Sequence, residues 1–239
     1  MSSSRALLLG RSLLDALFPP RCLACRGGAW DSPLRGLCAP CAAALPMIRA
    51  PCRRCGREAG AFAAASPCPA CRDEATDLDG VVAAVRYRDT ARDLVLALKF
   101  GGRPPAAIPL GLLLADAVLA ADRPGDLVVP VPLSAARFRR RGHNQADEIA
   151  RVVAKRTGID RDVRALARRR GGPPQSGLSR PARSRGPRGA FVARRDRVEG
   201  GCVLLIDDVV TTGATAGSCA RALRRAGALR VVLGAACRA

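Results

Sequence analysis

The sequence predicts an α/β protein with a mainly parallel sheet, preceded by a small cysteine-rich module. The first third of the 239-residue chain is rich in Cys and Pro and has little apolar periodicity. The remainder alternates apolar, strand-like runs with helical segments, and Val203–Ile206 is apolar at four consecutive positions, as expected for a strand buried on both faces. Strands that alternate with helices favour parallel pairing, because each helix returns the chain to the edge from which the next strand starts.

The change of pattern near residue 78 sets the expected elements and domains. Strands are expected at Val81–Tyr87, Leu127–Val131, Val163–Ala167, Val203–Ile206 and Leu229–Ala235. Helices are expected at Thr90–Phe100, Pro109–Ala121, Gln145–Thr157 and Gly213–Ala226. We therefore divide the chain into residues 1–77, which hold an N-terminal helix over Arg5–Phe18 and the cysteine-rich module, and residues 78–239, which are enough for one α/β core.

Eight cysteines in the first part form an internal repeat with an offset of thirty residues. The two halves, each reading C-x2-C-x12-C-x2-C, are Cys22, Cys25, Cys38 and Cys41, and Cys52, Cys55, Cys68 and Cys71. Each C-x2-C turn can point two sulfurs at a common centre, and two such turns complete the tetrahedral four-thiolate shell of a zinc ribbon. We predict two structural Zn²⁺ ions that largely substitute for a core; sequential pairing of the ligands is expected, with interleaved ribbons as the alternative.

Disulfides are the main competing interpretation of the cysteine repeat. The segment Arg5–Phe18 is interrupted by Arg11 and Asp15 and has no small-residue cleavage site, which is not typical of a signal peptide. No stretch reaches the ~18 uninterrupted apolar residues of a membrane span. The sequence therefore predicts a cytoplasmic protein whose thiols stay reduced, which favours zinc over disulfides. An iron–sulfur cluster or redox-active C-x2-C pairs could also account for the repeat.

The segment 203–215 reads as a complete site for a sugar phosphate. Asp207 and Asp208 are expected where the predicted strand ends, which is where open α/β sheets bind ligands, and they could hold the 2′- and 3′-hydroxyls of a ribose. The following turn leads into a predicted helix, whose free N–H groups and positive end suit a 5′-phosphate. The expected binding residues of this turn are Val209, Val210, Thr211, Thr212, Gly213, Ala214 and Thr215. A strand-end Asp pair for Mg²⁺, or a capped helix with solvated acids, would explain the carboxylates but not the Thr-Thr-Gly-Ala-Thr run.

A second segment could bind a pyrophosphate. The predicted strand Leu127–Val131 runs into a rigid loop whose backbone N–H groups could meet the ligand, so the expected contacts are Val131, Pro132, Leu133, Ser134 and Arg137. The run Arg139–Gln145 could bind the same group or lie on a solvated turn. His143 is the only histidine, and within a run of arginines we expect a contact or surface residue rather than a general base.

The formal net charge of +20 is concentrated in the second part of the chain. Residues 79–239 hold 30 Lys and Arg against 14 Asp and Glu, whereas residues 1–78 hold 10 against 6. Within Arg161–Arg197, twelve Arg face two Asp, and the Gly-, Pro- and Arg-rich segment Arg168–Arg188 could be a lid or an insertion without structure. This excess predicts contact with a nucleic acid; a solvated basic face and a compositional bias toward Arg are the alternatives.

The thirteen residues 203–215 resemble the phosphoribosyl pyrophosphate (PRPP) motif of type I phosphoribosyltransferases, and the chain from Phe18 onward resembles the ComF family of competence-associated proteins. The second resemblance rests on the cysteine pairs together with Lys99-Phe100 followed by Gly101-Gly102-Arg103, Val129-Pro130-Val131-Pro132-Leu133, Arg141-Gly142-His143-Asn144-Gln145, Pro174-Gln175 with Leu178, Gly189-Ala190-Phe191 and the Asp-Asp motif. It implies a zinc module joined to a type I phosphoribosyltransferase fold and adds Lys99 to the expected ligand-binding residues.

The resemblance also implies a role in natural transformation, with PRPP or a related compound, single-stranded DNA and other competence proteins as partners. If the domain is catalytic, Asp207 and Asp208 would fix the ribose while pyrophosphate leaves C1 of PRPP, and Mg²⁺ would neutralise the leaving group. A metabolic phosphoribosyltransferase acting on a base or amine, and a non-catalytic module that senses a nucleotide, are the alternatives. The sequence does not identify the acceptor.

Overall fold

The structure, a computed structural model, describes residues 21–28, 32, 34–60, 68–71, 76–122, 125–169 and 189–239. The expected helix over Arg5–Phe18 lies outside these residues, as does nearly all of the segment Arg168–Arg188. Among the described residues, no helix is both long enough and apolar enough to cross a membrane.

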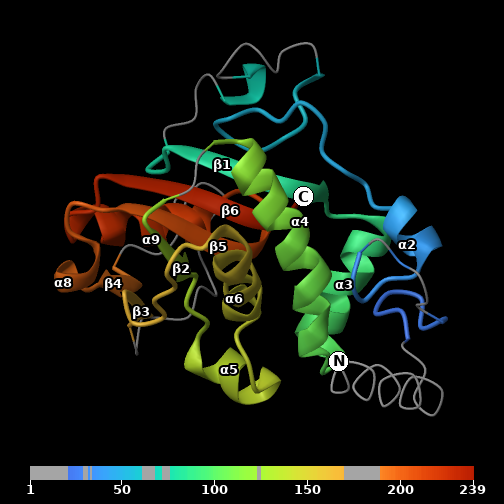
Figure 1. The fold of residues 1–239 in the computed structure, drawn as a ribbon. Coiled ribbons are helices and arrows are strands. Elements are labelled where there is room, and N and C mark those ends of the chain that lie inside the picture. The colour runs from blue at the N-terminus through green and yellow to red at the C-terminus, as the bar shows by residue number, and fades with distance from the viewer. Residues whose placement is uncertain are drawn as a thin grey trace, which may run out of the picture.

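A four-stranded parallel sheet forms the centre of the second part of the chain, in the order β1-β6-β5-β2 (Figure 1). Its strands are β1 (Gly80–Arg86), β2 (Leu127–Pro130), β5 (Cys202–Val210) and β6 (Arg230–Arg238). The two inner strands, β5 and β6, are almost continuously buried, which explains their long apolar runs. The predicted α/β fold with a mainly parallel sheet is confirmed.

Helices cover both faces of this sheet. The helices are α3 (Asp89–Phe100), α4 (Ala107–Ala120), α6 (Gln145–Thr157) and α9 (Ala214–Arg225), with the short turn η3 (Pro104–Ala106) before α4. Side chains of α3, α4 and α6 pack with Leu204 and Ile206 of β5, whereas those of α9 pack with Val203 and Leu205. Alternate residues of β5 therefore serve opposite faces, and Figure 1 shows α4 and α6 in front of the sheet with α9 behind it.

Strand β5 is longer than predicted, and this corrects the position of the two carboxylates. Its pairing with β6 continues past Ile206, with Asp207 opposite Ala235 and Val210 opposite Arg238. Asp207 and Asp208 therefore lie within the strand rather than after its end. The apolar run misled the prediction, because ladder hydrogen bonds come from the backbone and do not require apolar side chains.

The strand expected at Val163–Ala167 is wrong. Arg161 makes a single parallel bridge to Val128 of β2, and Asp162 then accepts a hydrogen bond from the Arg164 N–H (2.7 Å), which turns the chain and leaves Val163 48% exposed. The strand here is β3 (Leu166–Arg168), which pairs antiparallel with β4 (Phe191–Ala193) in a separate sheet. Strand β4 and the helices α5 (Ala135–Arg141) and α8 (Arg195–Val198) were not predicted.

The cysteine-rich part contains α2 (Ala39–Ala43) and the short turn η2 (Pro69–Cys71). Between its two cysteine clusters, the chain runs antiparallel along the outer edge of β1: Ile48 donates to the Ala84 carbonyl (3.2 Å), and Arg86 donates to the Pro46 carbonyl (2.9 Å). This pairing covers a sheet edge that would otherwise expose unpaired backbone groups. Leu37 and Leu45 pack into the same apolar cluster as α3 and α4, and a domain boundary at residue 77 stays a prediction.

Candidate functional site

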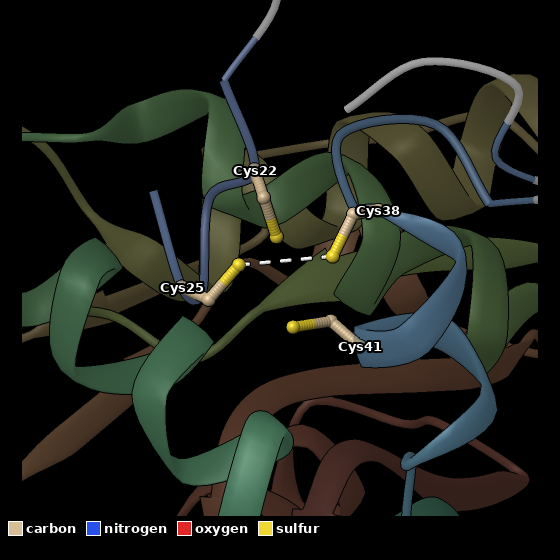
Figure 2. Close-up of side chains that lie close together, drawn as sticks. All are labelled: Cys22, Cys25, Cys38 and Cys41. Carbon is tan, nitrogen blue, oxygen red and sulfur yellow. Dashed lines mark hydrogen bonds between the residues drawn. The ribbon is translucent and has the colours of Figure 1, made fainter. Parts of the chain in front are cut away.

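The eight predicted zinc ligands form two clusters of four sulfurs. Within each cluster, the ligand atoms all lie within 4.8 Å of one another. Figure 2 shows the first, in which Cys22 and Cys25 face Cys38 and Cys41 across a common centre. The second consists of Cys52, Cys55, Cys68 and Cys71. The ligands of each site are therefore consecutive along the chain, as expected, and the ribbons are not interleaved.

The distances between sulfurs fit a tetrahedral Zn²⁺ site. Zn–S bonds of about 2.3 Å in a tetrahedron place sulfurs about 3.8 Å apart. The observed distances are 3.7 Å for Cys25–Cys38, 3.9 Å for Cys55–Cys68 and 3.6 Å for Cys68–Cys71. A disulfide would require about 2.05 Å, and all described cysteines are free thiols. The residues present fit two structural zinc sites.

The thiols of the first cluster differ in acidity. Burial raises the pKa of Cys22, but the backbone N–H groups of Cys38, Cys25 and Ala24 outweigh it and lower the pKa to about 6. For Cys41, burial and the neighbouring thiols raise the pKa to about 12. Since zinc requires deprotonated thiols, loading this cluster must displace a proton from Cys41.

Asp207 and Asp208 lie near the carboxyl end of β5 and are held by the backbone that follows them. Asp207 accepts a hydrogen bond from the Asp208 N–H (2.9 Å), and Asp208 accepts one from the Val209 N–H (2.8 Å). Asp208 is buried, whereas Asp207 is partly exposed. The two carboxylates are therefore fixed in orientation, and Asp207 is the more accessible of the two.

Lys99, from the last turn of α3, forms an ion pair with Asp208, with Nζ and Oδ2 2.8 Å apart. Burial and the negative charge of Asp208 raise the pKa of Asp207 from 3.8 to about 8, and the positive charge of Lys99 partly opposes this. Asp207 therefore tends to hold a proton near neutral pH unless a further positive charge or a hydrogen-bond donor reaches it. Such a perturbed carboxylate is typical of a functional site.

The turn after β5 has the geometry of an anion-binding segment. Gly213 adopts a left-handed conformation (φ 75°) at the N-cap of α9, which begins at Ala214. Thr212 accepts a hydrogen bond from the Ala214 N–H (3.4 Å) through Oγ1. Thr211 and Thr212 are exposed, so their hydroxyls and the first N–H groups of α9 can reach a ligand.

The predicted pyrophosphate loop begins beside Ile206 of β5, the residue before Asp207. Strand β2 is the direct neighbour of β5, and the Val131 N–H donates to the Ile206 carbonyl (2.9 Å). The Asn144 side chain donates to the Val131 carbonyl (3.0 Å), and Ser134 caps α5. Among the described residues, the structure thus brings Lys99, the Asp pair and both loops to one edge of the sheet, whereas it gives no direct contact between Arg137 and the carboxylates.

Comparison with known proteins identifies the relatives of this chain. A double zinc ribbon domain model matches residues 13–72. DNA utilization protein YhgH of Salmonella typhi is 34% identical over 208 residues, which are 85% of this chain and 90% of the relative. The Escherichia coli K12 protein of the same name is 32% identical over 229 residues, which are 92% and 97% of the two chains. Competence protein F of Haemophilus influenzae is 29% identical over 214 residues, or 87% and 92%. The chain belongs to the ComF family.

Two solved structures are similar to part of this ComF-family chain. One is described as the allosteric regulatory enzyme of purine biosynthesis (23% identity, TM-score 0.41), and the other is glutamine phosphoribosylpyrophosphate amidotransferase from B. subtilis (26% identity, TM-score 0.39). Each similarity covers 59% of this chain and 30% of the other chain.

Two residues of the ComF site have contacts that the sequence patterns did not predict. His143 bridges two elements, with Nδ1 3.0 Å from the Arg141 carbonyl oxygen and Nε2 2.9 Å from the Leu98 carbonyl oxygen, directly before Lys99. Arg238 at the end of β6 donates to the carbonyl oxygens of Val210 (3.0 Å) and Thr211 (2.6 Å) in the phosphate turn. The signal for Arg238 was a charged residue that follows the apolar run Val231–Cys237.

Part of the charge in the described residues of Arg161–Arg197 is neutralised within the fold. Seven of its twelve arginines are described, and four of these seven form ion pairs: Arg161 with Asp147, Arg194 with Asp196, Arg195 with Glu199 and Arg197 with Asp162. A fifth, Arg168, places its guanidinium over the Phe191 ring, 5.3 Å from the ring centroid. The count of arginines therefore overstates the positive charge that the described part of this segment offers to a partner.

Proposed function

We propose that this ComF-family protein binds PRPP together with Mg²⁺ and binds single-stranded DNA, acting in the cytoplasm during natural transformation. One observation supports the PRPP assignment: Val131 at the start of the loop after β2 donates to the Ile206 carbonyl of β5, so this loop leaves the sheet beside Asp207 and Asp208. Ligands of open α/β sheets bind at such an edge.

Each part of PRPP has residues suited to it. Asp207 and Asp208 accept hydrogen bonds from the ribose hydroxyls, and segment 209–215 surrounds the 5′-phosphate. The backbone of Val131–Ser134, with Arg137 and Lys99, faces the pyrophosphate. The raised pKa of Asp207 supports this assignment, because two donor hydroxyls would stabilise the carboxylate that burial and Asp208 disfavour.

Mg²⁺ fits this site chiefly as a partner of the ligand. Lys99 already neutralises Asp208, so Asp207 is the carboxylate of the pair that is left to approach a cation. The remaining ligands would be pyrophosphate oxygens and water, which is how proteins commonly hold Mg²⁺ on phosphates. The ion supplies charge neutralisation for the pyrophosphate group.

We further propose that the domain is a phosphoribosyltransferase. The bond between C1 and the pyrophosphate oxygen breaks as a bond from C1 to an acceptor forms, and the electron pair leaves with pyrophosphate. The protein contributes positioning and charge, with Asp207 and Asp208 fixing the ribose. A metabolic enzyme would use a base or amine as acceptor, whereas a nucleotide sensor would bind PRPP without turnover.

Calorimetry with Mg²⁺ and PRPP tests the binding proposal. Asp207→Asn/Asp208→Asn removes two charged acceptors, and loss of such hydrogen bonds costs about 1.5–3 kcal/mol, or roughly ten- to a hundredfold in affinity. Asp116→Asn, on the exposed face of α4, is the matched control and should bind as the wild type does. Wild-type protein that binds no PRPP, or a double variant that binds as tightly as wild type, would refute the proposal.

The names of the relatives support the DNA part, since they are a DNA utilization protein and a competence protein. Titration of a fluorescent single-stranded oligonucleotide at 50 and 200 mM salt should show binding that weakens steeply with salt. Release of pyrophosphate from PRPP, measured with bases, amines or single-stranded DNA present, separates the catalytic candidates. If none of these acceptors causes pyrophosphate to be released, a nucleotide sensor is the better description.

A further inference from the structure

The surface of α5 combines exposed aromatic rings with arginines that form no ion pair with the described residues. We define the α5 surface as Phe100, Phe138, Arg139, Arg140 and Arg141. Phe138 is 50% exposed and Phe100 is 65% exposed, among the largest exposures of bulky apolar side chains in the described chain. Figure 1 shows α5 at the margin of the molecule, outside the layer formed by α4 and α6.

Arg141 joins the two rings into one surface. Its guanidinium lies over the Phe100 ring, 5.1 Å from the centroid, at the distance of a cation–π contact. Phe138 is three residues before Arg141 on α5 and therefore shares its side of the helix. The Phe100 ring therefore contacts Arg141, and Phe138 lies on the same side of α5.

The charge of this surface is available to a partner. Arg139 and Arg140 are exposed, and no ion pair found in the described part of the chain involves either of them. This contrasts with Arg194 and Arg195, which are also exposed but paired with Asp196 and Glu199. Unpaired guanidinium groups beside exposed rings complement a partner that offers both phosphates and flat apolar faces.

We propose that the α5 surface binds single-stranded DNA, with bases stacked on Phe100 and Phe138 and phosphates against Arg139 and Arg140. In a duplex the base faces are already stacked, so exposed rings select an unpaired strand. This inference rests on the proposed DNA binding and deepens it, because it moves the contact from Arg161–Arg197 to α5.

The strand would lie beside the proposed PRPP site. Phe100 directly follows Lys99, whose Nζ contacts Asp208. Burial lowers the pKa of Arg141, and the negative charge of Asp208 opposes this, so Arg141 lies within electrostatic reach of the carboxylate pair. A nucleotide stacked on Phe100 is therefore held next to the bound sugar phosphate.

The stacking part is tested with Phe100→Leu and Phe138→Leu, which keep an apolar side chain but remove the ring. Affinity for a 20-nucleotide single strand should fall by about five- to a hundredfold for each variant, in the range measured for base–aromatic stacking. Affinity for the same sequence as a duplex should change less than about twofold. Zinc content and PRPP affinity serve as folding controls, since neither ring belongs to those sites.

The charge part is tested with Arg139→Gln/Arg140→Gln against the matched control Arg194→Gln/Arg195→Gln. The α5 pair should lower the slope of log K against log salt by about 1.4, from about 0.7 per lost phosphate contact on single strands, and the control pair should leave it nearly unchanged. Equal effects of the two pairs, or ring variants that bind as tightly as wild type, would overturn the α5 assignment. Wild-type protein that binds no single strand at about 50 mM salt would instead refute the DNA-binding function itself.

Discussion

Arg238 donates a hydrogen bond from Nε to the carbonyl oxygen of Cys55 (3.1 Å), although 183 residues separate the two in sequence. The same guanidinium contacts the carbonyl oxygens of Val210 and Thr211, and Arg238 is buried, with 7% of its surface exposed. The buried guanidinium of Arg238 therefore joins the second cysteine cluster to the turn that precedes α9. The metal site and the candidate phosphate site share a structural support.

Replacing Arg238 should weaken both sites. In Arg238→Met, the carbonyl oxygens lose their charged donor, and we expect the free energy of unfolding to fall by about 2–4 kcal/mol in urea titrations. Zinc should also leave the second cluster faster in a chelator competition, whereas the first cluster should be little changed. Arg225→Met, on the exposed side of α9, is the control and should match the wild type. Unchanged zinc release in Arg238→Met would contradict the link.

Lys99 and Asp208 should behave as a coupled pair. Lys99→Met leaves a mostly buried carboxylate without its cation, so we expect a loss of about 2–3 kcal/mol, less than for a fully buried pair because the Lys99 side chain is 21% exposed. Adding Asp208→Asn to Lys99→Met should restore at least half of that loss. Urea denaturation of the four proteins in this cycle measures the coupling, and strictly additive losses would show that the ion pair contributes nothing.

Local sequence signals predicted most accurately those elements whose ends are marked by capping residues. The predicted helix Gln145–Thr157 matches α6 at both ends, because Asn144 caps its first turn and Gly158 ends it with φ 76°. The cysteine repeat likewise predicted both metal clusters, since ligand spacing is a local property. Strand ends were less predictable, and β5 runs beyond its apolar core to Val210 because β6 continues to pair with it.

The contacts that define the candidate site join residues far apart in the chain, and no local pattern encodes them. Lys99 and Asp208 come from different elements, and the partner of Arg238 lies in the cysteine-rich part. The excess of arginine in Arg161–Arg197 did not indicate that Arg161 pairs with Asp147 or that Arg197 pairs with Asp162. Charge counting assigns a sign to a segment, but only the fold decides which charges neutralise one another.

Close packing of α4 on α6 should make Gly111 sensitive to a single methyl group. A Cβ at Gly111 would lie 2.5 Å from the Val152 Cβ, so the helices must move apart or Val152 must shift. Gly111→Ala should therefore lose about 1–3 kcal/mol of stability despite the better helix propensity of Ala. In Gly201→Ala the nearest atom would be 3.6 Å away, and that variant should be nearly neutral. Equal unfolding midpoints for both variants would refute the packing argument.

The raised pKa of Asp207 predicts that stability decreases with increasing pH. Burial and the charge of Asp208 raise this pKa from 3.8 to about 8, so in this range the folded protein holds a proton that the unfolded chain has released. The resulting loss in the free energy of unfolding grows as pH rises and is complete above about pH 8. Asp207→Asn removes it while its side-chain oxygen can still accept the Asp208 N–H.

In the absence of ligand, Asp207→Asn should therefore be more stable than wild type, with a difference that widens from about pH 4 to about pH 8 and then stays level to about pH 9. We expect a difference on the order of 1–3 kcal/mol at about pH 9, well below the full shift, because Asp207 is partly exposed and solvent screens its charge. Urea titrations across this range measure it, with Asp116→Asn as a control whose difference from wild type should stay constant. A constant difference for Asp207→Asn as well would mean that its carboxylate is ionised in the folded protein throughout. A widening one, combined with weaker PRPP binding, would show that this position sacrifices stability for ligand binding.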